Sequence, residues 1–140
     1  MDEIRLAGGT QPELVVECAG RYPNGEAEWL WITVRGSGLT ATQRVWEHRW
    51  VGFADYFAAL ESDWRGWKGE RVYESTEDDL RLTATHDGHV WLHIELCHER
   101  DASDGAERRG WTVETWLRLN PGEELSHPSR GIRAVVGVDS

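Results

Sequence analysis

The chain has 140 residues, with 25 acidic residues against 15 lysines and arginines and a formal net charge of −10. This length is typical of one domain that buries its own core, so we expect a single α+β domain over residues 1–140. The negative charge repels phosphate backbones and anionic lipids, which argues against nucleic acid and membranes and favours a basic protein partner.

Targeting and redox signals are weak in this sequence. The first residues, MDEIRLAGG, lack the apolar stretch of a signal peptide, and no run of about eighteen apolar residues could span a membrane. Cys18 and Cys97 are too far apart for a metal or redox pair and are expected to be free, buried thiols. We therefore expect a cytoplasmic protein without a cofactor.

Alternating apolar residues predict strands in the first third of the chain. From Glu28 to Arg35 the even positions form one apolar face, whereas Trp29 and Trp31 lie on the other. A two-residue turn at Gly36 and Ser37 would place Val34 opposite Leu39 and keep that face apolar. Two earlier segments show the same alternation and predict a further strand and an edge strand: residues 14–18 and 4–6.

A helix is predicted from Val51 to Trp64, packed on the apolar sheet face. Its buried stripe has helical spacing and consists of Phe53, Phe57, Leu60 and Trp64. The following WRGWKGE segment is typical of a helix C-terminus, with Gly66 or Gly69 in the left-handed region and both tryptophans in the core. The acidic run from Glu74 to Asp79 is interpreted as a solvated lead-in to the next strand.

A second hairpin is predicted from Leu80 to Leu96. A three-residue loop, His86-Asp87-Gly88, would pair Leu82 with Leu92 and keep the aliphatic residues on one face. The polar segment from His98 to Gly110 is expected to be a long exposed hairpin loop.

One more strand and a closing helix complete the prediction. In Trp111 to Leu119 the odd positions from Val113 onward point inward. Asn120-Pro121-Gly122-Glu123 is a helix start, and Pro128 should kink or restart that helix. Its expected buried stripe is Leu125, Ile132, Val135 and Val136. The elements together predict a two-layer α+β fold with a mostly antiparallel, twisted sheet of about six strands, one helix between the hairpins and one at the C-terminus.

The second face of this sheet collects tryptophans. Four exposed indoles would cover roughly 600 to 1,000 Å², more than the roughly 300 to 600 Å² of the largest apolar patch on a typical monomer. Either loops and arginines cover these rings internally, which is the commoner arrangement, or a partner does. The second alternative predicts a partner-binding surface of Trp29, Trp31, Arg44, Trp91, Trp116 and Arg118.

No catalytic residue is predicted, because the sequence contains no recognisable nucleophile elbow or active-site cysteine. Three residues, His89, His93 and Glu95, are weak candidates for metal ligands, although their spacing along one strand fits a polar strand face better. The alternative to a protein-binding role is an enzyme, or a small-molecule or metal-binding protein. Its site would lie at the His86–His93 hairpin or between sheet and helix.

Two segments of the sequence resemble those of a known protein family: GFADYFAALESDWRGWKGE from Gly52, and LRLTATHDGHVWLHIEL from Leu80. They resemble a family of small uncharacterised bacterial proteins, a domain of unknown function common in high-GC Gram-positive bacteria. The resemblance covers the middle third of the chain most clearly and residues 111–138 loosely. It implies a stand-alone domain and lends no activity, cofactor or site residue.

The sequence therefore favours a non-enzymatic, acidic protein-binding module. In size and charge it is similar to immunity proteins that neutralise toxins, which would make the basic partner a toxin. A third alternative is a homo-oligomerising domain whose own tryptophan surface forms the interface, so that the protein is either a monomer or a homodimer.

Overall fold

The computed structural model describes residues 2–100, 108–120 and 123–138, and within these ranges the chain forms two antiparallel four-stranded sheets and two helices. The α+β class is confirmed, but the expected single sheet of about six strands is replaced by two sheets. The first sheet consists of β1 (Glu3–Ala7), β2 (Glu13–Arg21), β3 (Ala27–Gly36) and β4 (Leu39–Trp46). The second consists of β5 (Arg71–Glu74), β6 (Leu80–His86), β7 (Val90–Arg100) and β8 (Arg108–Leu119). The helices are α1 (Val51–Ser62) and α2 (Glu123–Val136).

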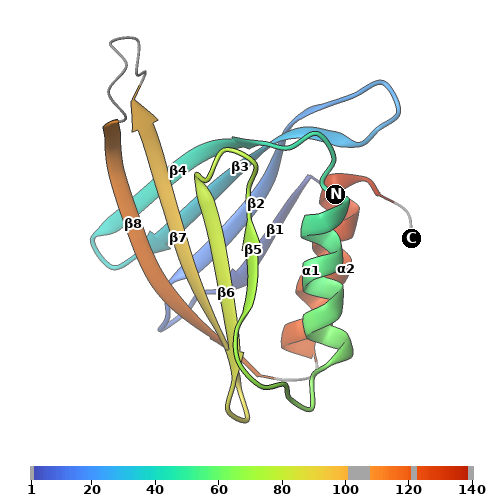
Figure 1. Ribbon diagram of the computed structural model, residues 1–140, viewed down its shortest axis with the longest axis vertical. Coiled ribbons are helices and arrows are strands. Elements are labelled where there is room, and N and C mark those ends of the chain that lie inside the picture. Colours follow the sequence, from blue (N-terminus) through green and yellow to red (C-terminus); the bar gives the residue numbers. More distant parts are fainter. Residues whose placement is uncertain (1, 101–107, 121–122, 139–140) are drawn as a thin grey trace.

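The two sheets enclose a common core, and the helices close one side of it (Figure 1). The helices α1 and α2 pack side by side, and α2 also contacts β1 and β2. Each strand has one apolar face, and burying these faces against each other removes both from water. The core side chains of the two sheets include Leu14, Leu30, Ile32, Leu82, Leu92, Ile94 and Leu117, all buried in one cluster.

The first hairpin has the predicted faces in a register shifted by two residues. Val34 lies opposite Ala41 and Gly36 opposite Leu39, so that the turn residues are Ser37 and Gly38 rather than Gly36 and Ser37. Gly38 has a φ of +74°, a conformation that glycine adopts without strain, and this favours the turn one residue later. A two-residue shift leaves every side chain on its predicted face.

The second hairpin is shifted in the same way. Leu82 pairs with Ile94 instead of Leu92, and the three-residue loop runs from Asp87 to His89 with Gly88 at a φ of +107°. The predicted loop length is therefore confirmed, but the loop lies one residue later in the sequence than predicted. The Asp87 carboxylate accepts a hydrogen bond from the His89 N–H, which stabilises the loop at the later position.

The helix α1 buries Phe53, Phe57 and Leu60 as expected but ends at Ser62. The placement of Trp64 in the core is wrong, because this side chain is 47% exposed. At the other end of the helix, Trp50 precedes α1, is fully buried and donates from Nε1 to the Glu28 carbonyl. A buried indole needs such an acceptor for its N–H.

The helix α2 continues through Pro128 and does not restart there. Ile132, Val135 and Val136 are buried as predicted, whereas the Leu125 side chain lies outside the described residues. At Gly131 a Cβ atom would lie 1.8 Å from Ile4 Cδ1, so the absence of a side chain allows α2 to pack directly on β1.

The polar segment from His98 to Gly110 is partly strand. The strand β7 extends to Arg100 and β8 begins at Arg108, so both strands enter the segment that was expected to be a loop; residues 101–107 lie outside the described residues. Among the described helices none is both long and apolar enough to cross a membrane.

Candidate functional site

The tryptophans of the predicted partner surface lie on two different sheets. Trp29 and Trp31 belong to β3 of the first sheet, whereas Trp91 and Trp116 belong to β7 and β8 of the second. All four point away from the aliphatic side of their strands, as the alternation predicted. The tryptophans therefore lie on the outer faces of two sheets rather than on one face of a single sheet.

On the outer face of the first sheet, an arginine covers the indoles. Arg44 pairs with Trp31 across β3 and β4, and its guanidinium carbon lies 4.3 Å from the centroid of the Trp29 ring and 6.0 Å from that of Trp31. A guanidinium over an indole face is attracted by the ring quadrupole and removes the ring from water. Trp29 is accordingly half-buried, and Trp31 is 40% exposed.

On the outer face of the second sheet, Trp116 is the most exposed large apolar side chain, at 52%. Its ring lies 4.6 Å from the ring of His93, its partner in the register of β7 and β8. The same register places Val72, which is 44% exposed, and Thr83 in line with these two residues. We call this line of four residues across the sheet the tryptophan row: Val72, Thr83, His93 and Trp116.

A charged line runs beside the tryptophan row. We call it the acidic row, and the strand register places its four residues in the order Glu74, Arg81, Glu95 and Glu114. Arg81 Nε lies 3.6 Å from a Glu74 carboxylate oxygen, and His93 Nε2 lies 3.4 Å from one of Glu114. Three carboxylates against one guanidinium give this part of the outer face an excess of negative charge.

Trp91 and Arg118 are neighbours on the other side of the tryptophan row. The Trp91 Nε1 donates to the Asp87 carboxylate at 3.0 Å, which holds this half-buried ring against the hairpin loop. The Arg118 backbone is also held, because the Gln11 side chain accepts from its N–H and donates to its carbonyl. These contacts fix the backbone under the exposed tryptophan row.

The weak candidates for metal ligands are separated in the structure. His89 lies in the hairpin loop, where its Nδ1 is 2.6 Å from Asn120 Oδ1. His93 faces Glu114 and Trp116, and Glu95 belongs to the acidic row beside Arg81. His86, at the start of the same loop, has both ring nitrogens within hydrogen-bond distance of backbone atoms. In the part of the chain that the structure describes, no three histidine, cysteine or acidic residues form a group able to hold a metal ion.

A partly buried polar network lies between the end of β4 and the turn that joins β5 and β6. The Glu47 carboxylate accepts hydrogen bonds from the Tyr73 hydroxyl and from the backbone N–H and hydroxyl of Thr76. Ser75 donates to the Asp79 carboxylate at 2.6 Å, and both residues are buried. The interpretation of this acidic run as a solvated lead-in is therefore wrong for Ser75 and Asp79.

The network shifts two acid–base equilibria. Burial raises the pKa of the Asp79 carboxyl above its ordinary value, and the Ser75 hydrogen bond offsets part of this effect. Burial and the Glu47 carboxylate raise the pKa of the Tyr73 hydroxyl, so it remains a donor at physiological pH. Because these carboxylates are occupied by donors of the protein itself, the arrangement is typical of a structural link between β4 and the second sheet.

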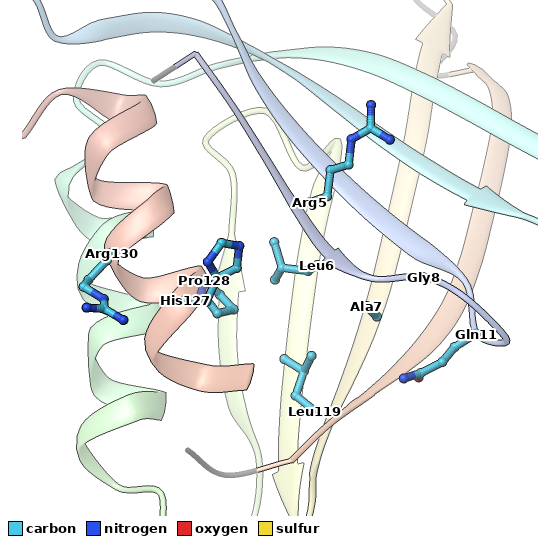
Figure 2. Close-up of a pocket in the computed structure, with 9 residues that line it drawn as sticks. All are labelled: Arg5, Leu6, Ala7, Gly8, Gln11, Leu119, His127, Pro128 and Arg130. Carbon is cyan, nitrogen blue, oxygen red and sulfur yellow. The ribbon is translucent and has the colours of Figure 1, made fainter. Parts of the chain in front are cut away.

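A pocket lies between β1, the end of β8 and α2 (Figure 2). It has a volume of about 650 Å³. Its lining residues come from segments far apart in the sequence and are Arg5, Leu6, Ala7, Gly8, Gln11, Leu119, His127, Pro128 and Arg130. Among the side chains that the structure describes, the lining contains no acidic residue. No local sequence motif indicates this pocket.

Fold and surfaces define an α+β protein with two facing antiparallel sheets, whose outer faces carry partly exposed tryptophans. Residues 9–139 match the model of a family described as Family of unknown function (DUF6228), and the chain belongs to that family. This match confirms the resemblance to a family of uncharacterised function. Comparison with curated proteins and with solved structures gives no match.

Proposed function

We propose that this protein is a non-enzymatic binding module that holds a basic protein partner on the outer face of its second sheet. The observation that carries the proposal is the half-exposed Trp116 beside the acidic row. A partner that is a basic toxin would make the protein an immunity-like inhibitor.

The tryptophan row supplies the apolar contact. Tryptophan is enriched among the few interface residues that contribute most of the binding free energy, because a large rigid ring loses much water and little conformational freedom. Trp116 and Val72 are both exposed, at 52% and 44%, whereas His93 is half-buried and Thr83 is buried between them. A partner would therefore make its main apolar contact with Trp116 at one end of the row and with Val72 at the other.

The acidic row supplies the selectivity for a basic partner. Glu74, Glu95 and Glu114 lie next to the tryptophan row, on a chain with a formal net charge of −10. Such a field accelerates the approach of cationic proteins and disfavours anionic ones. Affinity for the partner should consequently fall as the salt concentration rises.

The outer face of the first sheet fits this role less well. Arg44 already lies over Trp29 and near Trp31, so a partner would have to displace or cover a guanidinium. Trp31→Ala is therefore a matched control for Trp116→Ala, since both change a partly exposed tryptophan on an outer sheet face.

The experiment captures partners from a lysate of the native host, identifies them by mass spectrometry and measures the affinity of the purified partner by calorimetry. We expect a basic partner whose affinity falls at least tenfold, about 1.4 kcal/mol, with Trp116→Ala, and less than threefold with Trp31→Ala. Glu95→Lys should weaken binding in the same way as Trp116→Ala. Each variant should keep its unfolding free energy within about 1 kcal/mol, as expected of surface positions.

Three results would contradict the proposal. The first is a partner whose affinity is unchanged by Trp116→Ala. The second is an acidic partner. The third is a dimer in sedimentation experiments that Trp116→Ala dissociates, because the outer face would then be the interface between two copies of this chain.

A further inference from the structure

We infer that the edge of β8 binds an extended segment of the partner, which adds an antiparallel strand to the second sheet and places a lysine or arginine opposite Glu114. The inference rests on the proposed function for the basic character of the partner, and it goes further by naming the mode of binding, strand addition through backbone hydrogen bonds. In the part of the chain that the structure describes, β8 is the last strand of the second sheet (Figure 1).

The backbone groups on the outer edge of β8 are available for such a strand. The Gln11 amide bonds to the N–H and the carbonyl of Arg118, so both groups point away from β7. Residues two apart on an antiparallel strand point to the same side, and the register of β7 and β8 is regular from Arg118 to Thr112. The N–H and carbonyl groups of Trp116, Glu114 and Thr112 therefore also point away from β7, and no described residue forms a hydrogen bond with them.

We call residues 112–116 the open edge of β8. Gln11 marks one end of it, because the Arg118 backbone is already bound at 2.9 and 3.0 Å. The open edge matches the usual strand length of about five or six residues. A short extended segment is therefore sufficient to pair with it.

The side chains on the inner side of the open edge are incompletely covered. Val113 and Thr115 point toward the core but are only half-buried, whereas their partners on β7, Leu96 and Ile94, are fully buried. An apolar side chain on an added strand would lie beside Val113 and remove more of it from water. The open edge thus offers apolar contact in addition to backbone hydrogen bonds.

The outer side of the open edge determines the charge of the added strand. The Glu114 side chain is 58% exposed and lies between Thr112 and Trp116 on this side. Its partner on β7 is Glu95, so two carboxylates are neighbours, and His93 Nε2 lies 3.4 Å from the Glu114 carboxylate. Opposite charges stabilise directly opposed positions of antiparallel strands, and like charges destabilise them. A lysine or arginine opposite Glu114 is therefore favoured.

A second copy of this chain fits the open edge less well. A symmetric antiparallel pair centred on residues 112–116 would place Glu114 opposite Glu114 of the other copy. Like charges in directly opposed positions destabilise strand pairing, and the net charge of −10 on each copy adds to the repulsion. The open edge therefore favours a partner of opposite charge over self-association.

The test is an NMR titration of the ¹⁵N-labelled protein with the peptide Thr-Thr-Val-Lys-Val-Thr-Thr, blocked at both ends. We expect saturable shifts concentrated at the amides of Thr112, Glu114 and Trp116. A control peptide carries N-methyl groups on the lysine and on the residues two before and two after it, which removes the donors facing β8, and should bind at least tenfold more weakly. A second control peptide with glutamate in place of lysine should bind at least threefold more weakly.

A pair of variants tests the charge. Glu114→Gln should weaken binding of the lysine peptide at least threefold, because the carboxylate opposite the lysine is lost. Glu17→Gln removes an exposed carboxylate from the outer face of the first sheet and should leave the affinity unchanged. A spectrum of each variant that retains the wild-type peaks away from the substitution shows that the variant is folded.

The inference is overturned if the lysine peptide gives no saturable shifts at these three amides, or if the N-methylated peptide binds equally well, since binding would then not use the backbone. Equal weakening by Glu114→Gln and Glu17→Gln also overturns it, because the effect would then come from the total charge. The titration does not use the captured partner. A basic partner that loses affinity with Trp116→Ala, together with a peptide that does not bind, would leave the proposed function standing and exclude strand addition alone.

Discussion

The outer faces of the two sheets both carry outward-pointing tryptophans. They differ in the residue that lies opposite the most exposed tryptophan on the neighbouring strand. Both place tryptophans at alternating positions, but Trp31 faces Arg44 and Trp116 faces His93. The long arginine side chain lies over one indole and reaches toward a second, whereas the shorter histidine contacts part of one ring. The cover of an aromatic residue on a sheet thus depends on the length of the side chains on the neighbouring strand, because Arg44 reaches past its direct partner Trp31 to the diagonal Trp29.

The largest stability effect should come from the link that holds the second sheet to β4. Glu47→Ala removes the acceptor of three hydrogen bonds and leaves the half-buried Tyr73 hydroxyl without it. We expect a loss of about 2 kcal/mol in the free energy of unfolding, measured by urea denaturation.

The matched control for that variant lies on the outer face of the first sheet. Glu17→Ala removes an exposed carboxylate opposite Trp31 and should change the stability by less than about 0.5 kcal/mol. Glu47→Gln retains an acceptor oxygen and should recover part of the loss. Equal effects of the two alanine variants would show that the network at β4 does not anchor the second sheet.

A smaller loss of stability is expected when the guanidinium that stacks on the indoles of the first sheet is removed. Arg44→Ala removes the guanidinium over Trp29 and should cost about 1 kcal/mol in unfolding free energy. Arg118→Ala, its counterpart on the second sheet, should stay within about 0.5 kcal/mol, because the bonds from Gln11 go to the Arg118 backbone. If the two variants lost equal stability, the contrast between the two faces would be wrong.

A pH-dependent effect on stability is expected at the buried Asp79. The pKa of Asp79 is raised in the folded protein, so the folded state holds this proton more tightly than the unfolded chain. The stabilisation is complete below the ordinary carboxyl pKa and is lost as the pH rises through the folded pKa. Asp79→Asn cannot ionise, so between about pH 3 and pH 7 the variant should gain stability relative to the wild type, by about 1.4 kcal/mol per unit of pKa shift.

Urea denaturation at a series of pH values measures this difference. Ser75 donates to Asp79, and an asparagine oxygen can accept the same hydrogen bond. The part of the difference that varies with pH reports the charge, and the constant part includes the altered hydrogen bond with Gln43. A constant difference between the two proteins across that range would mean that Asp79 has the same pKa in the folded and unfolded states.

Local alternation was sufficient to predict the strands other than β5, together with the orientation of their side chains. Leu82 and Ile94 point inward and Trp116 outward because a period of two residues fixes the faces of a strand. Alternation alone could not predict the exact turn positions. Gly36 and Gly38 both allow a turn, and the position depends on which of the two glycines adopts a positive φ.

The division into two sheets could not be derived from the same pattern. Alternation defines faces within a strand, but it does not say whether the strands before and after α1 share one sheet. The network of Glu47 with Thr76 joins residues 29 positions apart, and the pocket joins Arg5 to Arg130. Such sites depend on tertiary contacts, so their residues were missed or taken for solvent-exposed charges.

The double hydrogen bond from Gln11 to Arg118 has a consequence for contacts between molecules. Backbone groups at the edge of a sheet readily pair with a strand from a neighbouring chain, which is a common route to aggregation. At Arg118 the backbone N–H and carbonyl of β8 already form hydrogen bonds with the Gln11 side-chain amide, as they would with the backbone of a paired strand. A strand from another molecule could pair with this edge of β8 only after displacing the Gln11 side chain. Gln11 therefore opposes strand-to-strand polymerisation at this position.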